Sequence, residues 1–388
     1  SIKQYAIDRL HESGTMERAR RAHARYFADL AAEAAATYGF TTQDEWLARY
    51  EPDLDNFRAA IDWAATHDTP LGARIVANLA EYWDYCGLAP EGLRRSEAAL
   101  ANVDGLAGAD AAPLQLAVAH LCSTVRSYRR GLEAGERALV TAERIGDPYL
   151  LARVRRTLGA VRYVLGEDRE RGANDLRMAL EYFRLHDNPL RRMGAIYAYA
   201  LTLEPDLGRP LFLEALALAE SSGWPRIAVA IEMNLSERDF WAGNVDDARA
   251  RTRRAIVLSR NRRAPLDLAM ALANLASYCC VAGAYDEGEV AAREAAAIAL
   301  AHEFNYSFAI AAQSLAVVRA GYGNAAAAAQ LLGYVDATFA TYGFSMERTE
   351  GMVRDRLHEL LHARMDEASL ARERAVGAAL SMQEASTL

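Results

Sequence analysis

One string in the sequence has the spacing of a zinc-binding motif. It is His358-Glu359-Leu360-Leu361-His362, which places two histidines one helical turn apart with a glutamate between them. In zinc hydrolases with this pattern the histidines bind the metal and the glutamate activates water. A catalytic zinc also needs a third protein ligand, and no further motif marks Glu373 or Glu384 as that ligand. A zinc-dependent hydrolase is therefore kept only as an alternative function.

The residues around this string indicate which side of a helix would be buried. At about 100° per residue, Leu357, Leu360 and Leu361 fall on one apolar stripe that faces a core. The two histidines flank or oppose that stripe, whereas zinc ligands lie inside a cleft. We interpret the string as a solvated histidine pair on a capping helix, and expect no metal, no cofactor and no catalytic residues in the chain.

The charged residues argue against two further function classes. The chain of 388 residues has 44 lysines and arginines against 52 aspartates and glutamates, which gives a net charge of −8. An acidic chain without a basic cluster repels polyanions, so we expect no direct contact with nucleic acid. Lys3 is the only lysine, and a P-loop requires a lysine directly before serine or threonine. The sequence therefore predicts no P-loop ATPase within this chain.

The apolar segments and the cysteines of the sequence indicate the cellular compartment of the protein. No apolar run approaches the roughly 18 residues of a membrane span. The cysteines form no CxxC pair and sit in apolar helical patterns; they are Cys86, Cys122, Cys279 and Cys280. We expect a cytoplasmic protein without membrane contact. Because a helical pattern begins directly at Ser1, we also expect the chain to be cut from something longer.

The elements that carry these residues are predicted to be helices in a repeat. Apolar residues recur at helical spacing, and no segment shows the sustained alternation of a strand, which predicts an all-α fold. At longer range, a turn glycine is followed by small residues five and then seven positions later. The clearest turn glycines are Gly87, Gly243, Gly283 and Gly321. The middle positions are Gly92, Gly131, Gly172, Gly208, Ala248, Gly288 and Ala326, at steps of 36 to 41 residues. Such a nearly fixed period predicts a repeat protein.

Each copy of this pattern predicts a helical hairpin. The turn glycine ends the first helix because it accepts left-handed backbone, and the small residues let the second helix approach the first. A single hairpin cannot bury its apolar face, whereas stacked hairpins can. We expect an α-solenoid, a right-handed superhelix of about seven hairpins, with a concave surface lined by the first helices.

Two copies resemble the tetratricopeptide (TPR) repeat in their order of large, small, aromatic, glycine, alanine, aromatic and alanine. The more similar copy is Leu79-Ala80, Trp83, Gly87, Gly92, Ser96, Ala99. The other is Leu275-Ala276, Cys279, Gly283, Gly288, Ala292, Ala295, in which cysteine and alanine replace the two aromatics. The period exceeds the usual 34 residues, so longer helices or linkers are expected.

Further stretches resemble large bacterial STAND-type ATPase regulators. Residues 1–10 (SIKQYAIDRL), Trp46-Leu47 and residues 53–64 (DLDNFRAAIDWA) are similar to the junction between the nucleotide-binding and winged-helix part of that family and its carboxy-terminal TPR-like region. Residues 379–385 (ALSMQEA) resemble the segment that closes that region. We expect a helical junction at 1–70 after an absent upstream domain, a repeat array at 71–345 and capping helices at 346–388.

The concave surface is the predicted place of function. Positions that line the groove in TPR repeats correspond here to Arg74, Glu81, Tyr85, Arg156, Tyr163, Tyr197, Glu237, Phe240 and Trp241. Charged side chains beside aromatic rings can hold a peptide or small ligand by stacking and charge-assisted hydrogen bonds. Residues of this kind also serve packing between repeats.

The sequence favours a non-catalytic sensor, the interaction region of a STAND-like signalling or transcriptional regulator. Its partner would be a protein, a peptide or a small-molecule inducer, and the resemblance implies that binding alters how the absent ATPase part assembles. A free-standing TPR adaptor or scaffold is the alternative. Whether the chain forms a homo-oligomer is left open, because the apolar end of a repeat array can mediate pairing of two copies.

Overall fold

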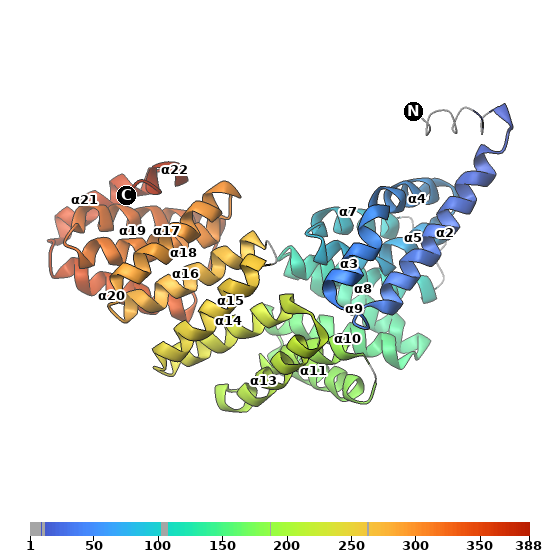
Figure 1. Ribbon diagram of the computed structural model, residues 1–388, viewed down its shortest axis with the longest axis horizontal. Helices are drawn as coiled ribbons and strands as arrows, with labels where there is room; N and C mark the ends of the chain where they lie inside the picture. Colours follow the sequence, from blue (N-terminus) through green and yellow to red (C-terminus); the bar gives the residue numbers. More distant parts are fainter. Residues whose placement is uncertain (1–8, 10–11, 102–107, 187, 262–263) are drawn as a thin grey trace. The chain divides into compact units, whose positions relative to one another are not determined.

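The computed structural model describes residues 9, 12–101, 108–186, 188–261 and 264–388, and in these residues only helices, turns and loops occur. The chain divides into two compact units, unit 1 (Ser1–Trp224) and unit 2 (Pro225–Leu388). Within each unit, helices that follow one another pack as antiparallel pairs (Figure 1). The predicted all-α fold of helical hairpins is confirmed.

Unit 1 starts with helices that precede the hairpins. These are α2 (Met16–Thr37), α3 (Gln43–Tyr50), the short 3-10 helix η1 (Glu51–Asp53) and α4 (Leu54–His67). The hairpins follow: α5 (Thr69–Asn78) and α6 (Ala80–Tyr85) with α7 (Ala89–Ala101), α8 (Gly108–Thr124) with α9 (Tyr128–Ile145), α10 (Pro148–Leu165) with α11 (Arg169–Arg184), and α12 (Pro189–Ala200) with α13 (Pro205–Ser222).

Unit 2 continues the pattern with hairpin helices of 17 or 18 residues. Its hairpins are α14 (Pro225–Trp241) with α15 (Val245–Asn261), α16 (Pro265–Val281) with α17 (Tyr285–Ala301), and α18 (Asn305–Gly321) with α19 (Ala325–Tyr342). The chain then forms α20 (Arg348–His362), α21 (Glu367–Ala378) and the single turn α22 (Met382–Ala385).

Proline and glycine mark the ends of the first helices. Helices α10, α12, α14 and α16 each start on a proline, which lacks the N–H that would have no partner there. Gly87, Gly243 and Gly283 follow α6, α14 and α16 with φ of 72°, 85° and 76°. A side chain is strained in this left-handed conformation, so these glycines permit the sharp turn to the second helix, as predicted.

Small residues bring the two helices of a hairpin together. A Cβ atom on Gly159 of α10 would lie 2.8 Å from the carbonyl oxygen of Gly172 in α11, and one on Gly172 would lie 2.9 Å from that of Gly159. A Cβ atom on Gly92 would lie 2.6 Å from the indole of Trp83. The predicted nesting of helices at Gly92 and Gly172 is therefore present.

The seventh hairpin corrects the predicted register. The residue with left-handed backbone is Gly323, with φ of 91°, whereas Gly321 is the last residue of α18 and packs against the ring of Tyr285. Ala326 is exposed, and the fully buried residue five positions after the turn glycine is Ala328. The run of alanines at 325–329 concealed this shift of two residues, because each of them satisfies a pattern of small side chains.

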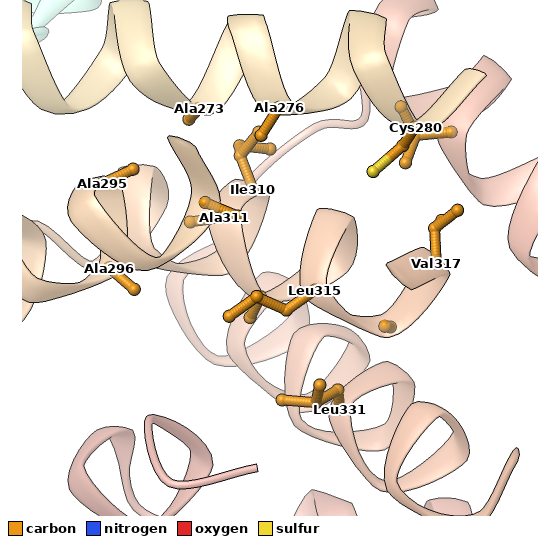
Figure 2. Packing of buried hydrophobic residues seen from close by; sticks show 14 of the residues in the cluster. Ala273, Ala276, Cys280, Ala295, Ala296, Ile310, Ala311, Leu315, Val317 and Leu331 are labelled. Atoms are coloured by element: carbon orange, nitrogen blue, oxygen red, sulfur yellow. The ribbon is translucent and has the colours of Figure 1, made fainter. Parts of the chain in front are cut away.

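The core of unit 2 lies between α16, α17, α18 and α19. Figure 2 shows Ala273 and Ala276 of α16, Ala295 of α17 and Ile310 of α18 among its buried side chains. Alanines at such contacts allow helix axes to approach closely, so the remaining branched side chains fill the space between them. This dense packing holds the first helices of unit 2 in fixed positions.

Helix α21 closes the end of this core by backbone contact. A Cβ atom on Gly377 would overlap the carbonyl oxygen of Gln330 in α19, and one on Gly333 would overlap that of Arg374 in α21. Gly333 lies seven positions after Ala326, where the repeat pattern predicts a small residue in contact with the first helix of its own hairpin. In the structure it serves the contact with α21 instead.

The division between Trp224 and Pro225 does not coincide with the boundaries expected at 70 and 345, which stay predictions. All of the junction-like stretch at 1–10 except Arg9 lies outside the described residues. Among the described residues, no helix is long and apolar enough to cross a membrane.

Candidate functional site

A small polar pocket opens on the face of unit 1 that is formed by the first helices of its hairpins. Side chains from α6, α8, α10 and α12 line it together. They are Ala80, Glu81, Leu116, Ala117, His120, Arg153, Arg156, Thr157 and Arg191. We call Arg153, Arg156 and Arg191 the arginine site. Its residues come from successive first helices, so the stacking of the hairpins creates the site.

Glu81 of α6 is the acidic member of this lining and joins two of the arginines. Its Oε1 atom lies 2.9 Å from Nη2 of Arg153 and 2.7 Å from Nη2 of Arg191. Burial alone would raise the pKa of Glu81, but Arg191 and Arg153 outweigh it and hold that pKa well below its usual range. Glu81 is therefore ionised throughout the neutral pH range.

Arg156 of α10 has a different environment. It makes no hydrogen bond or ion pair with the residues that the structure describes. Burial, together with the neighbouring guanidinium of Arg191, lowers the pKa of Arg156. A Cβ atom on Gly194 of α12 would lie 3.8 Å from its Nη1 atom, so no side chain at that position crowds the guanidinium. Arg156 thus offers free donors beside the pocket.

The charges around the pocket do not balance. The three arginines face two carboxylates, Glu81 and Asp84, and the Asp84 Oδ2 atom lies 3.4 Å from Nε2 of His120. At least one positive charge is therefore left without a counter-charge even when His120 is neutral. Such an excess in a partly buried site is unfavourable unless an anion binds there.

A loop from the amino-terminal part of unit 1 lies next to Arg191 of the site. This loop, residues 38–42, joins α2 to α3. Asn188 donates from Nδ2 to the carbonyl oxygen of Tyr38 at 2.9 Å, and Trp224 donates from Nε1 to that of Thr41 at 2.8 Å. Gly39 has φ of 90°, and a Cβ atom there would lie 2.6 Å from Cβ of Leu190. The loop is therefore docked tightly against α12 and the end of α13.

Aromatic rings pack around Tyr38 of this loop. The guanidinium carbon of Arg191 lies 4.6 Å from the ring centroid of Tyr38, a cation–π distance. The rings of Trp46, Tyr85 and Trp224 lie 5.3 to 5.9 Å from that of Tyr38. Burial and the neighbouring phenol of Tyr85 raise the pKa of Tyr38, so its hydroxyl stays neutral and polar beside the arginine site.

Three of the predicted groove residues thus lie at or next to the pocket: Glu81, Tyr85 and Arg156. The other three in unit 1 lie elsewhere. Arg74 is exposed on α5, Tyr163 lies under the guanidinium of Arg169 at 5.5 Å, and Tyr197 packs against Phe212 of α13.

The predicted residues of unit 2 form a separate group. Phe240 is 1% exposed and stacks on Tyr278 at 4.5 Å, so it belongs to the core. Trp241 donates from Nε1 to Oγ1 of Thr349 at 2.9 Å. Burial, with Glu347 and Glu350 nearby, raises the pKa of Glu237 to about 8. Glu237 is therefore mostly protonated at neutral pH.

The HExxH string lies in α20 as predicted, with Leu357 and Leu361 fully buried. The rings of His358 and His362 stack at 5.8 Å, and Nδ1 of His362 lies 3.1 Å from Oε1 of the exposed Glu367. Within the described part of the chain, no three His, Cys, Asp or Glu side chains gather in a way that could hold a metal ion.

Sequence reasoning missed His120, Arg153, Arg191 and the loop of Tyr38. Arg153 and Arg156 stand three positions apart, hence on one helix face, and Arg191 interrupts the apolar pattern of α12. These two features of the sequence could have identified Arg153 and Arg191 as further residues of the site. No sequence signal links Tyr38 to Asn188, because the contact depends on how the unit folds back on itself.

Comparison with known proteins supports the fold. No family model matches the sequence, and no curated protein matches it. Among solved structures, it is similar to a Rap protein complexed with the competence and sporulation factor, at 13% identity over 92% of this chain and 99% of that one, with a TM-score of 0.57. It is also similar to NprR in complex with its cognate peptide NprX, at 13% identity over 88% of this chain and 98% of that one, with a TM-score of 0.56.

A third similar structure belongs to a larger protein. It is a STAND protein from Pyrococcus horikoshii with a tetratricopeptide repeat sensor, at 13% identity and a TM-score of 0.54. The match covers 83% of this chain and 54% of that one, about half of its length. At such identities the likeness establishes the fold alone, and this fold is a TPR-like array of helical hairpins, as the residue pattern predicted.

Proposed function

We propose that this chain is the sensor region of a STAND-like signalling or transcriptional regulator, and that it binds a peptide or protein partner on the first-helix face of unit 1. The observation that carries the proposal is the arginine site, where Arg156 offers unused donors beside the docked rings of Tyr38 and Tyr85. Charged donors next to aromatic rings are what a peptide-binding surface uses for affinity and orientation.

The comparisons support a ligand of this kind. The similar Rap and NprR structures are complexes with the competence and sporulation factor and with the cognate peptide NprX, and the similar STAND protein has a tetratricopeptide repeat sensor. In a STAND-like setting, ligand binding by the repeats would control the assembly of an upstream ATPase part in the cytoplasm. A reading frame that encodes a P-loop before Ser1 supports this setting, whereas a gene without one favours the free-standing adaptor.

The binding proposal can be tested with a random peptide display library selected on the immobilised chain. Selected peptides should bind Arg156→Gln at least about tenfold more weakly than wild type, since a charge-assisted contact is lost. Arg184→Gln is the matched control, because Arg184 is an exposed arginine on the second helix α11. Failure to select any peptide over an unrelated protein, or equal binding to both variants, would contradict the proposal.

A further inference from the structure

The arginine site has donors that the chain itself does not use. Arg191 is 4% exposed, and its Nε atom has no hydrogen-bond partner in the structure; the same holds for the buried Nε atom of Arg153. Arg156 adds an entire guanidinium without a partner among the described residues. One buried acceptor of the site also has no partner, Oε2 of Glu81, but the donors without a partner outnumber it. Buried donors without acceptors are costly, so a further acceptor would complete the site.

From these contacts we infer that the arginine site binds a carboxylate group, presented by the ligand between Arg156 and Arg191. This inference rests on the proposed function and names the chemical group that the proposed ligand carries into the site. A guanidinium can donate two parallel hydrogen bonds to a carboxylate. Within the site, Arg153 and Arg191 each already contact a carboxylate oxygen, the Oε1 atom of Glu81, through one Nη2 atom.

Charge and space favour a carboxylate over a phosphate. The excess of about one positive charge, left after Glu81 and Asp84 are counted, is neutralised by one monoanion. The pocket is small, and Leu116, Ala117 and Thr157 are among its lining residues. A planar group with two oxygens takes up less room than a tetrahedral dianion with four, which favours it in a small pocket.

A substitution at Gly194 can place a carboxylate of the chain itself in the arginine site. Its Cβ position lies 3.8 Å from Nη1 of Arg156, so an aspartate there would bring its carboxylate within hydrogen-bond reach. We expect the equilibrium constant for unfolding of Gly194→Asp to be about tenfold smaller than that of Gly194→Asn, which has the same shape without the charge. Urea titration at pH 7 measures both. Equal stability, or a less stable aspartate variant, would overturn the inference.

Free anions test the same site without any change at Gly194. Acetate should raise the melting temperature of the wild-type chain by about 2–4 °C relative to chloride at equal pH and ionic strength. The rise should vanish in Gly194→Asp and in Arg156→Met, and persist in the control Arg184→Gln. A rise that survives in Arg156→Met would refute the site. Because phosphate stabilises folded proteins in general, only the part of its effect that is lost in Arg156→Met is compared, and a larger Arg156-dependent rise with inorganic phosphate than with acetate would refute the choice of carboxylate.

These measurements need no peptide, so their outcome is separate from that of the peptide selection. Loss of the acetate effect with intact peptide binding would remove the carboxylate inference alone. An intact acetate effect without any selected peptide would leave the anion site and remove the proposed peptide sensor.

Discussion

The Nη2 atom of Arg191 in α12 lies 2.7 Å from Oε1 of Glu81 in α6, and the two side chains are 4% and 7% exposed. This ion pair connects the first and the fourth hairpin of unit 1. Because Arg153 contacts the same oxygen, one carboxylate holds two guanidinium groups together at the candidate site.

Removal of the Glu81 charge should therefore destabilise unit 1 strongly. We expect Glu81→Gln to lower the free energy of unfolding by about 3–5 kcal/mol, since it leaves buried arginines without a counter-charge. Glu214→Gln, which breaks an exposed pair with Arg184, should cost at most about 1 kcal/mol. Chemical denaturation of both variants measures the difference, and similar losses would contradict the role given to Glu81.

The docked loop of residues 38–42 should not tolerate a side chain at Gly39. Gly39→Ala adds a clash with Leu190 to the strain of left-handed backbone, whereas Gly343→Ala carries the same kind of strain in open space. We expect a loss of about 2–4 kcal/mol for Gly39→Ala and about 1 kcal/mol for Gly343→Ala. Thermal unfolding compares them. A red shift of tryptophan fluorescence in Gly39→Ala alone would report the exposure of Trp224.

Two helical glycines of unit 2 should respond to alanine in opposite directions. Gly377→Ala would force α21 away from α19, where the backbone of Gln330 occupies the Cβ position. Gly351 in α20 has nothing within 4 Å, so Gly351→Ala should stabilise the chain by roughly 0.5–1 kcal/mol through helix propensity. Hydrogen exchange of α21 should become faster only in Gly377→Ala. Equal protection in both variants would mean that α21 tolerates displacement.

The raised pKa of Glu237 predicts a pH dependence of stability. The native state keeps a proton on Glu237 up to about pH 8, whereas the unfolded chain releases it near its ordinary value of 4.5. The native state thus binds more protons between these values, and the stability contributed by this group falls as the pH rises through that window. Glu237→Gln should be more stable than wild type at pH 9 by roughly 1–3 kcal/mol.

The groups that face Glu237 are Glu347, Glu350, Arg238 and the phenol of Tyr278, so Glu350→Gln should produce part of the same effect. Urea denaturation at pH 5 and pH 9 gives the comparison. A constant difference between Glu237→Gln and wild type across this range would contradict the assigned pKa.

The histidine string should be independent of metal. We expect purified protein to contain no stoichiometric zinc and its melting temperature to remain the same after dialysis against a chelator, because His358 and His362 lack a third ligand among the described residues. Elemental analysis and thermal unfolding check this. A drop in melting temperature that zinc reverses would restore the hydrolase alternative.

The sequence alone determined the helical hairpins and most of their turns. Gly87, Gly243 and Gly283 act through their own backbone angles, and Gly92 and Gly172 through contacts inside one hairpin, so spacing along the chain is enough to predict them. The same logic failed at Ala326, where neighbouring alanines satisfy the pattern equally well.

The arginine site was decided by the tertiary structure. Arg156 and Glu81 could be predicted as groove residues, but whether an arginine is paired depends on which side chains from distant helices come within about 4 Å of it. Arg153 and Arg191 share Glu81, the loop of Tyr38 folds back onto α12, and Arg156 is left without a partner among the described residues. Such an excess charge depends on the distances between side chains of different hairpins. The spacing of residues within one hairpin does not predict those distances.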